Sequence, residues 1–216
     1  MEESKRQDHP EDGSRRFAKA IKIVWERPGN SPSFGEISAI YEQRSNDLEG
    51  QIKKSNDYGE AMLWHRMMDA YLTDAIKSRF VANTKTAAGH LFKHPGGLSS
   101  FSARMYLGRC MGLYGATTYA DLKIINDIRN SFAHPRNDMS GQLELWGFDY
   151  SEVVTECAKL EFVKQCRITK GLDWPDSARE RFRLTTHYIG FGLWVQYLIP
   201  GGWSDGKHPP WPDLLP

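Results

Sequence analysis

Hydrophobic residues recur at helical spacing along most of the chain. Between residues 57 and 81, apolar side chains return every three or four positions, which predicts one long amphipathic helix. They are Leu63, Met67, Ala70, Tyr71, Ile76 and Phe80. Comparable patterns behind potential capping residues predict further helices over residues 33–48, 99–114, 117–134, 149–166 and 173–198. The pattern therefore predicts an all-α protein, a single bundle of about five or six helices.

The two ends of the chain lack this periodicity. Residues 1–16 are polar and aperiodic, which is typical of a disordered tail. Residues 200–216 are rich in proline and contain two tryptophans, so they cannot form a regular helix. The helical domain is therefore expected to occupy residues 17–199, with an irregular segment after it.

Glycine and proline predict the breaks between the helices. Residues 83–98 are rich in glycine and are expected to form a loop. Gly115 is expected to close one helix in a left-handed conformation, and Thr117 or Thr118 to cap the next. Residues 141–148 are expected to form an edge strand or an extended connection.

One segment carries side chains suited to chemistry. It is the run Arg129-Asn130-Ser131-Phe132-Ala133-His134, at the C-terminal end of a predicted helix. Asn130 and His134 are four residues apart and share a helix face, with Arg129 one step around. A guanidinium can stabilise charge on a phosphate, and an imidazole can move a proton to or from a ribose 2′-hydroxyl. These three residues are therefore candidate catalytic residues for phosphodiester cleavage.

The same residues also have a purely structural interpretation. His134 precedes Pro135 and is expected at the last turn of the helix or just past it, where its ring can cap backbone carbonyls. Arg129 can pair with Asp121, Asp127 or another acidic residue. The residue pattern leaves both interpretations open. Arg104, Arg109 and Lys123 are candidate binding residues that could add positive charge near Arg129, or they belong to a solvated face.

The overall charge argues against a protein that coats nucleic acid. The chain has 28 Lys and Arg against 27 Asp and Glu, a net charge of +1, whereas phosphate-binding faces need a basic surplus. A DNA-reading helix over residues 117–134 could present Lys123, Asn126 and Arg129. Its isoleucines belong to the core, however, and Asp121 and Asp127 would repel phosphate. Direct DNA binding is therefore disfavoured.

No motif in the sequence predicts a cofactor, a metal site or a membrane span. His90 and His94 are four apart, but the zinc-binding His-Glu-x-x-His pattern is missing, so a surface pair is expected. Cys110, Cys157 and Cys166 form no Cys-x-x-Cys pair, which favours a reducing cytoplasm. The most apolar stretch, residues 188–199, is too short to cross a bilayer.

The segment from Gly96 to Pro135 resembles the mannitol operon repressor family, which consists of small all-helical bacterial proteins. The matching residues are Gly97-Leu98, Ser102-Ala103-Arg104, Gly112-Leu113, Asp121-Leu122 and Ile128 through His134. Gly97 stands where the family often has proline, and the C-terminal half shares only the helical rhythm. The resemblance implies a regulatory protein that forms a homodimer and controls transcription indirectly, through contacts with another protein.

The Arg129-Asn130-x-x-x-His134 element is also similar to the signature of HEPN domains. These are dimeric helical proteins, and many are metal-independent ribonucleases. The likeness implies Arg129 and His134 as a catalytic pair and Asn130 as a polar helper, acting on RNA and leaving a cyclic phosphate. Arg136 stands where one type of HEPN toxin has tyrosine. We therefore expect a regulatory protein, with a HEPN-type ribonuclease as the alternative, and whether the protein is an enzyme stays open.

Overall fold

The computed structural model describes residues 34–52, 54–80, 85–134, 136–137, 143–144, 147–165 and 174–198. The chain divides into two compact units, residues 1–40 and 41–216. In the first unit, the described segment, residues 34–40, is helical. All contacts discussed below lie within the second unit. The predicted tail (residues 1–16) and the predicted C-terminal segment (residues 200–216) lie outside the described residues.

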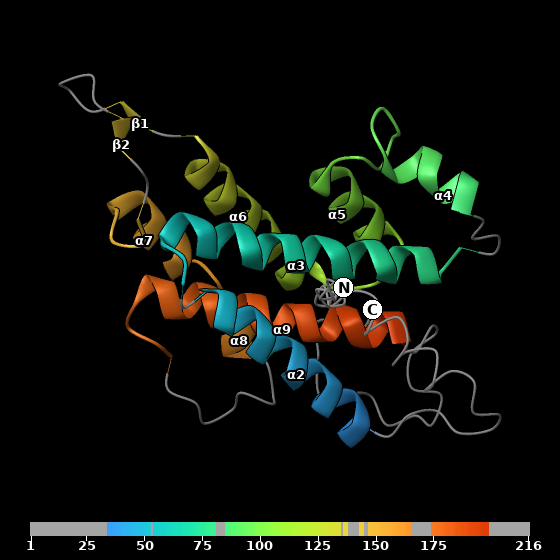
Figure 1. Cartoon of the computed structure of the whole chain (residues 1–216), viewed down its shortest axis with the longest axis horizontal. Helices are drawn as coiled ribbons and strands as arrows, with labels where there is room; N and C mark the ends of the chain where they lie inside the picture. The colour runs from blue at the N-terminus through green and yellow to red at the C-terminus, as the bar shows by residue number, and fades with distance from the viewer. Residues whose placement is uncertain are drawn as a thin grey trace, which may run out of the picture. The chain divides into compact units, whose positions relative to one another are not determined.

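The described residues are mostly helical, which confirms the predicted all-α class (Figure 1). The helices are α2 (Phe34–Ile52), α3 (Asp57–Ser78), α4 (Lys85–Phe92), α5 (Phe101–Cys110), α6 (Ala116–Ala133), α7 (Ser151–Ala158), α8 (Phe162–Gln165) and α9 (Ala178–Leu198). Two short strands, β1 (Arg136–Asn137) and β2 (Leu143–Glu144), pair antiparallel, with Arg136 opposite Glu144. Only β2 lies inside the predicted edge strand or extended connection at residues 141–148, and β1 precedes that segment.

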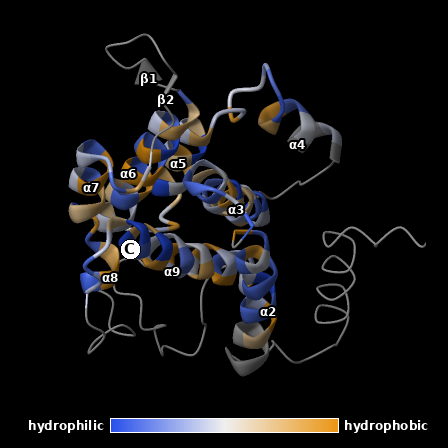
Figure 2. Cartoon of the chain, turned by 60° about the vertical axis from the view of Figure 1, so that its left-hand side comes forward, coloured by the Kyte–Doolittle hydropathy of each residue, from blue (hydrophilic) through white to orange (hydrophobic). Residues whose placement is uncertain are grey.

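Helices α3 and α9 form the centre of the second unit. They run side by side and make its most extensive inter-helix contact (Figure 1). Helices α5 and α6 pack against α3, whereas α7 and α8 pack against α9 and α6. Hydrophilic and hydrophobic residues are mixed within each helix (Figure 2), as amphipathic packing requires. No helix in the described part of the chain combines the length and the apolar character needed to cross a membrane.

Aromatic side chains connect these helices. The ring of Phe148 lies 5.1 Å from that of Phe132 in α6 and 5.3 Å from that of Phe182 in α9. On the other side, buried Tyr41 of α2 donates a hydrogen bond of 2.6 Å from its hydroxyl to the carbonyl of His187. Its ring also contacts Phe191 at a centroid distance of 4.9 Å. These contacts fix α2, α6 and α9 around a shared core.

Local residues determine several helix ends. Asn56 caps α3 by accepting a hydrogen bond from the backbone N–H of Gly59 at 2.9 Å. Ser100 caps α5 in the same way through the N–H of Ala103 at 3.1 Å. His134 is the C-terminal cap of α6, as expected from the proline that follows it.

Other predicted boundaries are wrong. The expected loop at residues 83–98 contains helix α4, because Lys85, Ala87 and Ala88 are good helix formers. Gly112, not Gly115, has the positive φ angle (68°) that ends α5. Gly115 is the N-cap of α6, and neither Thr117 nor Thr118 holds that place. The predicted helix over residues 149–166 is divided into α7 and α8.

Candidate functional site

The C-terminal end of α6 carries the predicted catalytic residues. The helix is held by Leu122, Ile125, Ile128 and Phe132, which are all buried. It ends after Ala133, and His134 adopts an extended conformation with its N–H bonded to the carbonyl of Ser131 at 3.2 Å. The side chain of His134 is exposed. The imidazole therefore lies outside the hydrophobic core.

Arg129 and Asn130 form a half-buried pair beside this helix end. The Nη1 atom of Arg129 donates a hydrogen bond of 3.1 Å to the side-chain oxygen of Asn130. The Nε atom of Arg129 is buried and has no hydrogen-bond partner among the described residues. Among the described residues, neither Asp121, Asp127 nor another acidic residue forms an ion pair with Arg129. Asp121 instead accepts hydrogen bonds from backbone N–H groups. One guanidinium donor therefore lacks a partner among the described residues, in the same helix end as the exposed His134.

Behind this pair lies a polar cluster that joins α3, α5 and α6. The Nε2 atom of His65 in α3 lies 3.4 Å from the side-chain oxygen of Asn126 in α6, and its ring packs on Phe101 at 4.5 Å. Burial lowers the pKa of His65, and the positive charge of Arg129 lowers it further. His65 is therefore neutral at pH 7. The sequence indicated a satisfied, partly buried histidine here, but not its partners on α5 and α6.

Arg104 belongs to this cluster and connects α5 to α3 through hydrogen bonds. It is only 6% exposed, its Nε atom donates to Asp69 at 2.9 Å, and its Nη1 atom donates to the carbonyl of Leu98 at 2.6 Å. Its charge also acts on His65, so Arg104 and Arg129 flank the same imidazole. Each of the three guanidinium nitrogens of Arg104 already donates a hydrogen bond within the protein, which is typical of a structural arginine.

The other two candidate binding residues lie on a different surface. Arg109 and Lys123 are exposed, and Arg109 also donates to the carbonyl of Tyr114 at 3.1 Å. Between them, Tyr106 of α5 and Tyr119 of α6 are in ring contact at 5.8 Å. A hydrogen bond with Tyr106 raises the pKa of Tyr119.

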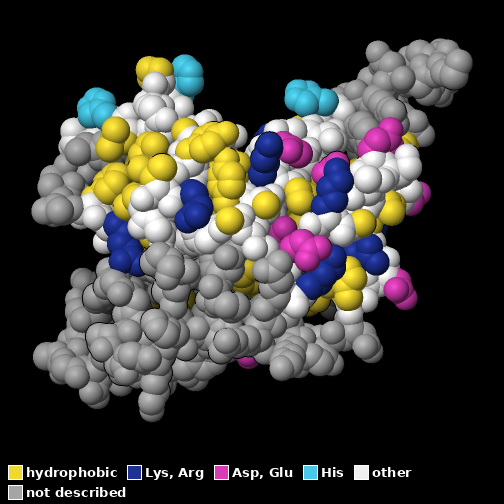
Figure 3. Space-filling model, turned by 180° about the vertical axis from the view of Figure 1, so that it is seen from behind, with side chains coloured by type: hydrophobic (Ala, Val, Ile, Leu, Met, Phe, Trp, Pro, Cys, Tyr) yellow, Lys and Arg dark blue, Asp and Glu magenta, His cyan; other side chains and the backbone are white. Residues whose placement is uncertain are grey.

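We call this face the tyrosine surface: Tyr106, Arg109, Cys110, Tyr119 and Lys123. Helical spacing places Arg109 and Cys110 beside Tyr106 on α5, and Lys123 beside Tyr119 on α6. Seen from behind, hydrophobic side chains gather on the part of the molecule that contains α4 and α5, at the upper left of Figure 3. Sequence reasoning missed this surface. The sequence does show a tyrosine on each of two neighbouring helices. Pairing them requires knowledge of which helix faces meet.

The described residues contain no group of three or more His, Cys, Asp and Glu side chains placed to hold a metal ion. His90 and His94 are both exposed, and His94 lies beyond the end of α4. A comparison of the chain with protein-family models, with curated proteins and with solved structures found no match in any of the three.

Proposed function

We propose that this protein is a regulatory protein that acts through contact with another protein, and that the tyrosine surface is its contact face. The observation that carries the proposal is the exposure of Tyr106, which at 61% is the highest among the exposed large hydrophobic side chains of the described residues. Water-exposed aromatic side chains are typical anchors of protein interfaces. The resemblance of residues 96–135 to the mannitol operon repressor family supports the same role.

The charges around Tyr106 indicate what the partner offers. Arg109 and Lys123 are both exposed, and each lies one helical turn from a tyrosine of the pair. A partner with an apolar pocket for Tyr106 and acidic residues at its rim would match this face. Because rim charges act mainly on the rate of encounter, reversing them should slow association more than it speeds dissociation.

The contact can be tested by photo-crosslinking in the cells that encode the protein. A photoreactive phenylalanine analogue replaces Tyr106 in one variant and Tyr58 in another, since Tyr58 is also exposed but lies in α3. We expect a discrete crosslinked product at Tyr106 only, either to a second copy of the chain or to another protein. The purified partner should then bind the wild-type protein and lose affinity for Tyr106→Asp. Equal products at both positions would contradict the proposal.

The proposed regulatory role is tested by a separate measurement. Transcript levels are compared between cells that carry the wild-type protein, Tyr106→Asp or Tyr58→Asp. If the contact face transmits regulation, Tyr106→Asp should reproduce the transcript changes of a deletion, and Tyr58→Asp should not. A deletion that leaves every transcript unchanged would refute the regulatory role.

A second candidate function is a metal-independent ribonuclease, favoured by the exposed imidazole of His134 and by the Nε atom of Arg129, which lacks a partner among the described residues, at the same end of α6. The 2′-hydroxyl of RNA would attack the adjacent phosphorus, and the bond to the 5′ oxygen would break, giving a 2′,3′-cyclic phosphate and a 5′-hydroxyl end. An imidazole that accepts the 2′ proton can pass it to the leaving oxygen. A guanidinium would stabilise the phosphorane charge, and a homodimer would bring two such sites together.

The ribonuclease is tested with purified protein and varied RNAs in excess chelator. Cleavage should yield cyclic phosphate ends and should disappear in His134→Ala, whereas His90→Ala is the control because His90 is also an exposed histidine. Arg129→Lys keeps the charge and should retain part of the rate. Cleavage that persists in His134→Ala, or no cleavage of any RNA, would exclude this function.

A further inference from the structure

A cavity of about 320 Å³ lies on the opposite flank of α3 from the polar cluster, between α2, α3 and α9. Its walls come from Glu49 and Ile52 of α2, Trp64 of α3, and Arg183, Leu184, His187 and Tyr188 of α9. Along α9, Arg183 and His187 are four residues apart, as are Leu184 and Tyr188, so the four residues form two adjacent rows. The volume is at the lower end of the range for small-molecule sites.

The inner wall of the cavity is aromatic and apolar. Trp64 is only 2% exposed, and its ring lies 6.3 Å from that of His187. Tyr188 continues the wall at 5.4 Å from His187, and buried Ile52 lies on the α2 side. Burial lowers the pKa of His187, so the ring is neutral at pH 7. Aromatic faces of this kind attract organic cations as well as flat rings.

The cavity has few polar groups, and they differ in whether they are already paired. Arg183 is paired through Nε and Nη2 with the carboxylate of Glu60, at 2.8 Å for the Nη2 bond. Its pKa is raised by Glu60, and the charges of Glu49 and Glu180 add to the rise, although burial opposes it. Negative charge therefore dominates even around this guanidinium. Within the described part of the chain, no ion pair occupies the carboxylate of Glu49.

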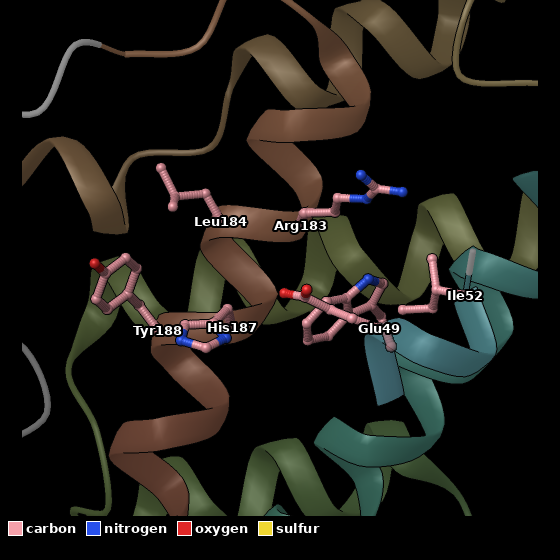
Figure 4. A pocket seen from close by; sticks show the side chains of 7 residues that line it. Glu49, Ile52, Arg183, Leu184, His187 and Tyr188 are labelled. Carbon is pink, nitrogen blue, oxygen red and sulfur yellow. The ribbon is translucent and has the colours of Figure 1, made fainter. Parts of the chain in front are cut away.

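The arrangement in Figure 4 places this carboxylate at the cavity. The side chain of Glu49 extends from α2 towards α9, and in this view its carboxylate lies between Arg183 and His187. The guanidinium of Arg183 points away from His187, and Leu184 and Tyr188 lie on the other side of α9 from Arg183. The charge of Glu49 acts on His187 as well as on Arg183.

A second polar group has no partner. The indole Nε1 of Trp64 is buried, and no acceptor among the described residues is within hydrogen-bonding distance of it. A buried N–H without an acceptor is unfavourable. Because this atom has almost no accessible surface, an acceptor on a bound molecule would reach it after a shift of the surrounding side chains. The cavity therefore combines aromatic walls, a buried donor and a carboxylate at its rim.

We propose that this cavity binds an arylalkylamine, a small molecule with an ammonium group, an aromatic ring and a hydrogen-bond acceptor on that ring. The ammonium pairs with Glu49, the ring packs between Trp64, His187 and Leu184, and the acceptor receives the indole N–H of Trp64. An anion would meet the carboxylate of Glu49, and a polyol would leave most of its hydroxyl groups against apolar walls. This site shares no residue with the tyrosine surface or with the Arg129–His134 segment.

The test is calorimetric titration of the full chain with four probes. Tyramine carries all three features, phenethylamine lacks the phenolic acceptor, N-acetyltyramine lacks the charge, and 4-hydroxyphenylacetate reverses it. We expect saturable binding of tyramine and an affinity about fivefold lower for each neutral or acceptor-free analogue, the size of one exposed ion pair or one neutral hydrogen bond. Equal affinity for N-acetyltyramine, a preference for 4-hydroxyphenylacetate, or no saturable binding of tyramine overturns the proposal.

Each group removed from the probe is matched by a substitution of the residue that would bind it. Glu49→Ala should weaken tyramine about fivefold and leave N-acetyltyramine unchanged, whereas Asp47→Ala, an exposed acid two residues away on α2, should change neither. Trp64→Phe should remove the preference for tyramine over phenethylamine. Because Trp64 is buried, its variant is first checked by thermal unfolding. The surface substitution at Glu49 decides the outcome if Trp64→Phe does not fold, and tyramine bound equally by Glu49→Ala overturns the proposal.

Discussion

The carboxylate of Asp121 in α6 caps the first turn of α8, where its Oδ2 accepts a hydrogen bond from the backbone N–H of Phe162 at 2.7 Å. Both of its oxygens also lie 3.1 Å from the N–H of Glu161. Asp121 and Phe162 are each about 1% exposed. A side chain from one helix thus determines where another, 40 residues later, begins.

Removing this cap should destabilise the protein. Asp121→Ala leaves two backbone N–H groups without their acceptor, and we expect the free energy of unfolding to fall by about 2 kcal/mol in urea denaturation. Asp127→Ala serves as the control because Asp127 is exposed on the same helix. Equal losses for the two variants would show that the Asp121 contacts contribute nothing specific.

The same carboxylate should give the stability a distinctive pH dependence. Burial raises the pKa of Asp121 to about 6 from its ordinary 3.8, although the two N–H bonds oppose the rise. The folded state therefore binds this proton more readily than the unfolded state, so the contribution of Asp121 to stability declines as pH rises from about 4 to about 6. Asp121→Asn lacks this titration, and its unfolding free energy relative to wild type should improve over that interval. A constant difference would contradict the shift.

His65 should produce the opposite slope. Its pKa is lowered from 6.5 by burial and by Arg129, while Asp69 and the bond to Asn126 oppose the change. The unfolded chain therefore takes up the proton first, and stability should be lost as pH falls below about 6.5. His65→Gln should flatten this part of the curve in urea unfolding between pH 7 and pH 5. A parallel curve for the variant would assign the acid sensitivity to other groups.

Arg104 should matter for stability rather than for ligand binding. Its guanidinium is buried and shared between Asp69 and the Leu98 carbonyl, so Arg104→Ala leaves a carboxylate and a carbonyl without their donor. We expect a loss of about 3 kcal/mol in the free energy of unfolding. Arg66→Ala, an exposed arginine of α3, should change it by less than about 0.5 kcal/mol.

Two glycines should respond in opposite directions to alanine. A Cβ at Gly190 in α9 would lie 3.0 Å from the Cε of Met67 and 3.1 Å from the hydroxyl of Tyr41. Gly190→Ala should therefore lower the unfolding free energy by about 1–3 kcal/mol. At Gly50 in α2 a Cβ meets no atom within 4 Å, and Gly50→Ala should raise stability by up to about 1 kcal/mol. Thermal unfolding of both variants checks the pair.

Periodicity predicts an element well when residues close to it in the sequence determine its boundaries. The apolar stripe of α3, the caps Asn56 and Ser100, and the end of α6 at His134 are all local features. The division of α7 from α8 was missed because the carboxylate that begins α8 comes from Asp121, far away in sequence.

The candidate site was predictable to a similar extent. Helical spacing placed Arg129, Asn130 and His134 at one helix end, and this is where they lie. Spacing does not say which helix faces meet, so it could not pair His65 with Asn126. For the same reason it could not bring Glu49 to the stripe of Arg183 and His187 across the cavity.

Trp64 and His65 are consecutive in α3, yet the first lines the cavity beside α9 and the second contacts Asn126 of α6. A helix behaves nearly as a rigid rod, so a molecule that tilted or slid α3 from one flank would carry the other flank with it. Binding in the cavity and ligand binding at the end of α6 would then both act on α3. Binding at either site would change the affinity of the other site by the same factor.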